Sequence, residues 1–260
     1  VGVVNNGAME RTLQNHNRTY TQGFNLVGNP YPSPIDWNAS GWTKTNIDDA
    51  IYFFNATGTT GIPTADDTIQ YQGTYSSYVN KVSTGNGTNV IAAMQGFFVH
   101  VTDGANYPVT GLLGITNQTR INNLNPAFKS ATYDNRTIFT FTAQSESTSS
   151  PEDVALIYFD NAATKAYDLS MDALKLKNTD PMVPSLYTFS EESKQLSINS
   201  MPMLTLADTL TEIPLGLYTL KSGWITILAK DISQLPTDMH IYLLDAEKNY
   251  IQNLQMNDSY

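Results

Sequence analysis

The chain of 260 residues contains no cysteine. That absence excludes a disulfide framework and every zinc or iron–sulfur site that needs thiolate ligands. Basic residues are scarce too: 14 Lys and Arg stand against 24 Asp and Glu, a formal net charge of −10. A nucleic-acid-binding protein needs a basic face to meet phosphate, so we expect no nucleic-acid partner. Long apolar runs are also missing, and residues 153–159 fall far short of the ~20 residues of a membrane span.

Helical periodicity is nearly absent as well. The best helical candidate, residues 167–177, is short and carries Asp168 and Asp172, so a turn is an equally good interpretation. Alternation of apolar and polar residues, which is typical of half-buried strands, recurs along the chain instead. Strand signals of this kind, or short apolar and aromatic runs, are found at residues 24–27, 50–54, 75–78, 96–101, 137–142, 196–198, 224–228 and 240–244. Residues 154–159 are apolar on both faces and predict a central strand of a covered sheet.

Short strands at this spacing predict an all-β fold with very little helix. We expect two packed β-sandwich units, jelly-roll or immunoglobulin-like, built from antiparallel strands. The composition changes near residues 122–126, which predicts a first domain at 1–125 and a second at 126–260. The sequence begins without Met and without the charged start of a signal peptide. We therefore expect an internal fragment of a longer protein; the family resemblance described below implies that strands of the first domain lie upstream of it.

Aromatic residues crowd the first half of the chain. Flat rings stack on sugars, so rings exposed on a β-sandwich would form a carbohydrate-binding platform. The alternative, which we favour, is that the rings fill the core between sheets, since each buries ~150–250 Å². The residues concerned are Trp37, Trp42, Tyr52, Tyr71, Tyr75 and Tyr78.

Metal ligands are few. The three histidines, His16, His100 and His240, are isolated in sequence and predict no metal site. Calcium prefers six to eight oxygen ligands, and one loop-rich stretch offers Asp160, Asn161, Asp168 and Asp172. The alternative, which we favour, is that these are turn-forming side chains neutralised by nearby lysines. No motif predicts a catalytic residue or an obligatory cofactor.

One segment is highly distinctive: Gly23-Phe-Asn-Leu-Val-Gly-Asn-Pro-Tyr-Pro-Ser-Pro-Ile-Asp-Trp37. Further motifs follow in order at residues 51–55, 73–80, 94–100, 117–122, 153–159, 163–175 and 213–216. Together they resemble the β-rich module that precedes the sorting domain in proteins exported by Bacteroidetes type IX secretion. The resemblance implies a Gram-negative bacterium, secretion, a cell-surface or extracellular location, and no catalytic residues. The sorting domain itself lies outside this sequence, and the secretion machinery would be contacted through it.

Two short triplets around Thr68 and Thr209 resemble the Asp-Ser/Thr-apolar O-glycosylation motif of Bacteroidetes exported proteins. Taken together, we expect a non-catalytic structural, adhesion-type module that presents upstream domains, with extracellular glycans or cell-surface proteins as partners. One alternative is a carbohydrate-binding module with an exposed aromatic platform. A second alternative is a hydrolase-associated domain, which a polar cleft with converging carboxylates would favour.

Overall fold

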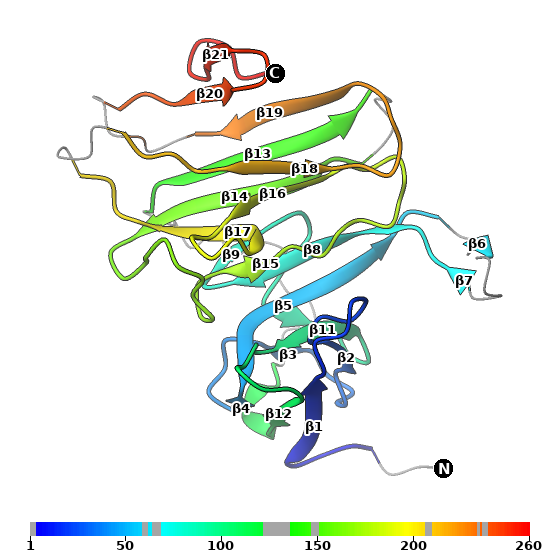
Figure 1. Ribbon diagram of the computed structural model, residues 1–260. Coiled ribbons are helices and arrows are strands. Elements are labelled where there is room, and N and C mark those ends of the chain that lie inside the picture. The colour runs from blue at the N-terminus through cyan, green and yellow to red at the C-terminus, as the bar shows by residue number, and fades with distance from the viewer. Residues whose placement is uncertain are drawn as a thin grey trace. The chain divides into compact units, whose positions relative to one another are not determined.

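The computed structural model describes residues 4–58, 62–63, 69–121, 136–146, 151–205, 210–232, 235 and 239–260. The described part is all-β, with one 3₁₀ turn, η1 (Asn117–Thr119), as its helical element (Figure 1). The chain divides into two compact units. Unit 1 comprises Val1–Phe54, Ser76–Thr132 and Leu169–Ala173, and unit 2 comprises Asn55–Tyr75, Tyr133–Asp168 and Leu174–Tyr260. The all-β prediction is confirmed.

Unit 1 contains three sheets, with strand orders β1-β12-β4, β2-β11-β5-β8-β9 and β10-β3. The strands are β1 (Met9–Asn15), β2 (Phe24–Gly28), β3 (Ile35–Asp36), β4 (Trp42–Thr45), β5 (Ile47–Ala56), β8 (Gly73–Val79), β9 (Val82–Ser83), β10 (Val90–Ile91), β11 (Gly96–Val101) and β12 (Val109–Ile115). Strands β5 and β8 each carry the chain from one unit into the other.

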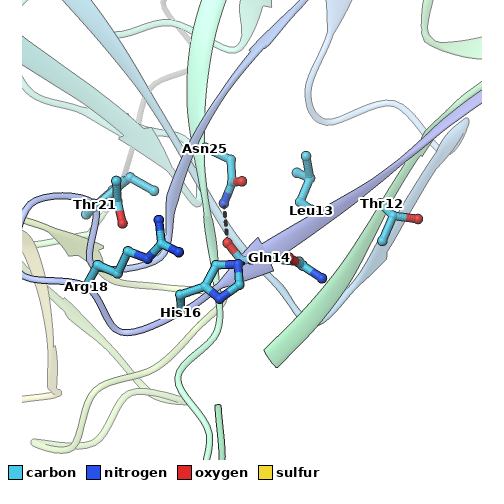
Figure 2. Close-up of a pocket in the computed structure, with 8 residues that line it drawn as sticks. Thr12, Leu13, Gln14, His16, Arg18, Thr21 and Asn25 are labelled. Atoms are coloured by element: carbon cyan, nitrogen blue, oxygen red, sulfur yellow. Dashed lines mark hydrogen bonds between the residues drawn. The ribbon is translucent and has the colours of Figure 1, made fainter. Parts of the chain in front are cut away.

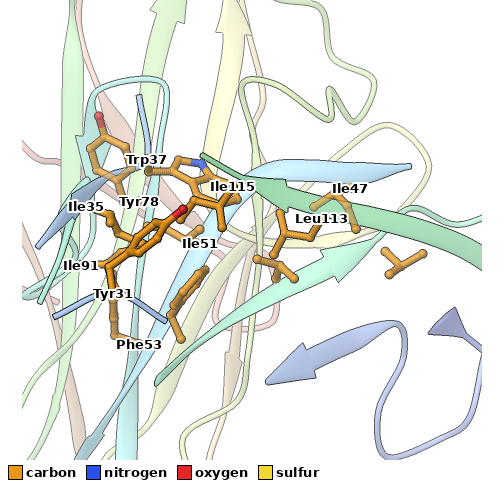
Figure 3. Close-up of a cluster of buried hydrophobic side chains, with 13 residues drawn as sticks. Tyr31, Ile35, Trp37, Ile47, Ile51, Phe53, Tyr78, Ile91, Leu113 and Ile115 are labelled. Atoms are coloured by element: carbon orange, nitrogen blue, oxygen red, sulfur yellow. The ribbon is translucent and has the colours of Figure 1, made fainter. Parts of the chain in front are cut away.

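The core of unit 1 is built from rings and β-branched side chains (Figure 3). Trp37 and Tyr31 are its largest fully buried members, and Phe97 of β11 meets Trp37 edge to face with ring centroids 6.1 Å apart. Burying each such side chain contributes about 1.5–3 kcal/mol. The period-two pattern of β11 follows directly, because Phe97 and Val99 point into this core.

Unit 2 is dominated by a seven-stranded sheet of order β18-β16-β17-β14-β13-β19, to which β15 adds by pairing with β17. Two-stranded pairs β6–β7 and β20–β21 complete it. The strands are β6 (Ile62–Pro63), β7 (Ile69–Gln70), β13 (Ile138–Ser145), β14 (Asp153–Asp160), β15 (Ala173–Leu174), β16 (Ser185–Phe189), β17 (Gln195–Pro202), β18 (Leu215–Tyr218), β19 (Ile225–Asp231), β20 (Tyr242–Asp245) and β21 (Tyr250–Asn253).

Strand β14 occupies the centre of this sheet, between β13 and β17, and its residues 155–159 are all buried. Residues 154–159 were predicted to form a central strand of a sheet that is covered on both faces. This prediction is confirmed. Phe139 of β13 meets Phe159 of β14 edge to face in the unit 2 core, with centroids 5.1 Å apart. At the far edge, Ile227 of β19 exchanges two backbone hydrogen bonds with Tyr260, at 2.8 and 2.9 Å.

Three expectations from the sequence concern strand direction, residues 167–177 and the domain boundary. Strands β14 and β17 pair in parallel, so the sheets are not purely antiparallel. Residues 167–177 form turns and the short strand β15, which pairs with β17, so the turn alternative describes this segment and the helical one does not. The domain boundary predicted at residue 125 falls among residues 122–135, outside the described residues, and stays a prediction. The two units themselves are interleaved, since residues 55–75 belong to unit 2 and 169–173 to unit 1.

No helix in the described ranges is long and apolar enough to cross a membrane.

Candidate functional site

The turn between β1 and β2 in unit 1 is held by a dense set of local hydrogen bonds. Asn15 Oδ1 accepts from the Asn17 amide at 2.8 Å, and the Arg18 carbonyl accepts from the Gln22 amide at 2.8 Å. Gly23 sits at φ +84°, where a Cβ would lie 2.6 Å from Asn15 Nδ2 and 2.7 Å from His100 Nε2. Only glycine satisfies both the left-handed backbone and this close approach.

A buried polar cluster anchors the turn from behind. His100 of β11 places Nδ1 2.6 Å from Asp48 Oδ2 of β5, and Nε2 2.9 Å from the Gln22 carbonyl oxygen. Asn15 donates from Nδ2 to the Val101 carbonyl at 3.0 Å and to Asp103 Oδ1 at 3.1 Å. Asn15, Asp48 and His100 are buried, whereas Gln22 and Asp103 are exposed residues. The His100–Asp48 and Asn15–Val101 hydrogen bonds therefore lie away from water and tie this region to β5 and β11.

An open hollow of about 410 Å³ lies on the outer side of the same turn (Figure 2). Its polar lining comes from the end of β1, the turn and the start of β2. The polar lining residues are Thr12, Gln14, His16, Arg18, Thr21 and Asn25, and the apolar ones are Leu13 and Phe24. Phe24 links the hollow to the buried cluster, since its ring centroid lies 5.0 Å from that of His100.

The lining of this hollow contains a cation and no carboxylate. Arg18 supplies the guanidinium, and the described residues provide no hydrogen-bond or ion-pair partner for its side chain. His16 Nε2 lies 2.8 Å from Gln14 Oε1. Asn25 donates both amide hydrogens, to the Gln14 carbonyl at 3.2 Å and to the Gly23 carbonyl at 2.8 Å, which leaves its Oδ1 as an acceptor. Such an arrangement can bind a polar, negatively charged small molecule.

The predicted aromatic platform of the first half is largely core. Trp37 is 1% exposed, and Tyr52 and Tyr78 are buried as well, so the faces of these three rings are not available to a sugar. Trp42 is half-buried and packs on the same core, with its ring centroid 4.6 Å from that of Trp37. The alternative in which the rings fill the core describes these four residues. Burial raises the pKa of the Tyr78 hydroxyl above its usual range, and Asn38 Nδ2, which donates to Tyr78 Oη at 2.6 Å, partly opposes the shift.

The other two members of the platform belong to unit 2. Tyr71 is exposed and Tyr75 is half-buried, and burial raises the pKa of the Tyr75 hydroxyl. Other exposed rings lie in the C-terminal part of unit 2, outside the six residues of the predicted platform. Trp224, just before β19, is 81% exposed, and Tyr242 of β20 is 56% exposed. The identical residue type is buried at Trp37, so composition alone carried no signal for this difference.

The four residues considered for calcium differ in their surroundings. Asp160 Oδ1 accepts from the Ala162 amide at 3.0 Å, as expected of a turn-forming side chain. Asp160 Oδ2 lies 3.8 Å from Arg136 Nη1. Asn161 is exposed and Asp168 is half-buried, whereas Asp172 is buried in unit 1. Across the described ranges no three His, Asp or Glu residues come together as a metal-binding group. Thr68 and Thr209 lie outside the described residues.

The distinctive proline-rich segment is tied to its surroundings by its own polar side chains. Buried Asn29 donates from Nδ2 to the carbonyls of Ser33 and Ala92, each at 2.9 Å, and accepts from the Tyr31 amide at 2.9 Å. Tyr31 Oη donates to the Gly7 carbonyl. These contacts supply donors to loop carbonyls and fix the conformation of the segment.

Unit 2 has a comparable device in a buried ion pair. Lys175 Nζ donates to Asp153 Oδ2, and the two side chains are 2% and 3% exposed. The same carboxylate accepts from the Leu186 amide of β16 at 2.6 Å. The pair therefore joins the start of β14, the segment after β15 and strand β16.

Over residues 1–260 the chain matches the model of a family described as a domain of unknown function, DUF8693, and it belongs to that family. A search of curated proteins and a search of solved structures each found no match. The resemblance to modules of type IX-exported proteins stays a prediction.

Proposed function

We propose that this member of the DUF8693 family is a structural, adhesion-type module of a secreted or cell-surface bacterial protein and presents upstream domains without performing chemistry. The observation that supports this role is the use of buried polar side chains as ties between segments distant in sequence. Asn29 bonds to residues up to 63 positions away, and Asp153 bonds to the amide of Leu186. Hydrogen bonds of this kind restrict the local opening of loops. A module under mechanical load requires such resistance to local opening.

Asn178 shows the same principle in unit 2. Its backbone amide donates to Ser185 Oγ at 2.9 Å. Its side-chain Nδ2 donates to the Pro184 carbonyl at 2.8 Å, and its side-chain Oδ1 accepts from the Tyr75 backbone amide at 3.0 Å. One buried side chain thus satisfies groups on two segments about 100 residues apart. Removing it would leave the buried Pro184 carbonyl without this donor, at about 1–3 kcal/mol, and the Tyr75 amide without this acceptor.

Pulling the chain by its two termini in optical tweezers tests the proposal. We expect cooperative unfolding steps in the wild type, a lower unfolding force in Asn178→Ala, and no change in the control Asn161→Ala, whose side chain is exposed. Gradual extension of the wild type at low force, without cooperative steps, would show that the chain is no load-bearing module.

Carbohydrate binding is a second candidate function, favoured by the exposed rings of Trp224 and Tyr242 in unit 2. Exposed aromatic rings provide flat faces for stacking. A glycan array tests this: binding by the wild type that is lost in Trp224→Ala and kept in Tyr20→Ala, an exposed ring in unit 1, supports it. No binding to any glycan by the wild type would contradict it.

A further inference from the structure

We propose that the hollow at the β1–β2 turn binds an acidic monosaccharide unit, a uronic acid, with the Arg18 guanidinium as the partner of its carboxylate. The inference does not depend on the structural role proposed above, because it is carried by the hollow itself. A volume of about 410 Å³ falls within the ~300–1,000 Å³ range of small-molecule sites.

The charge of the lining points to an anionic ligand. The chain as a whole has a net charge of −10, yet no Asp or Glu lines this hollow, and Arg18 does. Two acidic residues beside the turn, Asp48 and Asp103, have other hydrogen-bond partners. Asp48 bonds to His100, and Asp103 accepts from Asn15 Nδ2 at 3.1 Å and from Tyr107 Oη at 3.2 Å. A guanidinium pairs with a carboxylate in a fixed, two-pronged geometry, which gives orientation as well as energy.

The remaining lining fits a sugar ring better than a simple anion. Thr21 and Gln14 offer a hydroxyl and an amide, and Asn25 Oδ1 can accept from a sugar hydroxyl because both its amide hydrogens are already donated. Leu13 and Phe24 add apolar contact for the C–H face of a pyranose. Polyhydroxylated edges and an apolar face occur together in a sugar and are absent from acetate or phosphate.

The hollow is preorganised by the buried cluster behind it. The Gln22 carbonyl lies 2.9 Å from His100 Nε2, and the Phe24 amide donates to the Thr21 carbonyl at 2.8 Å. Gly23 lies so close to Asn15 and His100 that a Cβ there would come within 2.8 Å of their side chains. A turn that is already ordered loses little conformational entropy when a ligand binds. Small ligands at a shallow site can therefore bind measurably.

Amide NMR titration of the full chain tests the proposal with D-galacturonate, D-galactose and acetate as probes. We expect galacturonate to shift amides of residues 12–25 and to bind at least about tenfold more tightly than galactose or acetate. Arg18→Gln should weaken galacturonate binding at least about tenfold. Arg11→Gln is the matched control: it removes the same charge from exposed Arg11 on β1, which is outside the lining, and should change binding less than about twofold.

Three outcomes would overturn the inference. Equal binding of galactose would remove the role of the carboxylate, and equal binding of acetate would remove the sugar. Equal weakening by Arg11→Gln and Arg18→Gln would show general attraction to positive charge rather than a site. Both variants should keep the wild-type amide spectrum outside residues 11–25. This control shows that weaker binding does not result from unfolding.

Discussion

Replacing Lys175 by methionine tests how much the buried ion pair of unit 2 contributes to stability. In the wild type, Asp153 Oδ2 accepts from Lys175 Nζ and from the Leu186 amide, and both charged side chains are at most 3% exposed. Methionine keeps the apolar length of lysine and removes the charge, so Asp153 stays buried with one backbone donor. Breaking a buried pair by removing one partner costs about 3–5 kcal/mol.

The double variant Asp153→Leu, Lys175→Met separates the pair from the packing around it. Replacement of both charges by apolar groups is often neutral or stabilising, because neither charge then has to leave water. We therefore expect the double variant to recover most of the loss, although the Leu186 amide loses its acceptor, which costs about 1–3 kcal/mol. The coupling energy between the two substitutions should have a magnitude of about 2 kcal/mol or more.

Urea unfolding measures the differences in unfolding free energy between these variants and the wild type. Hydrogen exchange at the amides of β14 and β16 assigns them to unit 2. Lys175→Met should accelerate exchange at the Leu186 amide as well as lower the unfolding midpoint. Strictly additive single and double variants, or a loss below about 1 kcal/mol in Lys175→Met, would refute the reasoning that this pair is desolvated and coupled.

Two further predictions concern unit 1. Gly23→Ala should destabilise the unit by clearly more than Gly7→Ala, since both glycines have positive φ but only at Gly23 would the new Cβ collide with neighbouring atoms, and thermal unfolding of the two variants should show this order. Tyr78 has a raised pKa because it is buried, so the folded state keeps its proton above pH 10 when the unfolded state has lost it, and stability should fall as pH rises through that range. Urea midpoints at pH 9 and pH 11 should therefore differ less in Tyr78→Phe than in the wild type, whereas Tyr20→Phe, at an exposed position, should leave the wild-type difference unchanged.

The strands that could be predicted from the sequence are those whose own apolar residues alternate or form a continuous run. Strand β14 has a continuous apolar run and β11 alternates, and both lie where they were predicted. Strand β1 was not predicted, because only Met9 and Leu13 interrupt a polar, exposed stretch. It becomes a strand by pairing along its whole length with β12, about 100 residues later in the chain. The hollow was missed for the same reason, since β1 supplies part of its lining.

The amino-acid sequence by itself determined the fold class and the chemistry that the chain lacks, because period-two apolar patterning and the absence of cysteine are local properties. Only the tertiary structure decided which polar and aromatic side chains are buried. Trp37 and Trp224 are the same residue, but one is enclosed by strands from several parts of the chain and the other is not. Arg18 and Gly23 lie on a turn whose shape depends on His100, and Asp153 meets Lys175 across the unit 2 fold. Exposure and pairing between distant segments are set by which strands become neighbours, and local residue patterns do not reveal those neighbours.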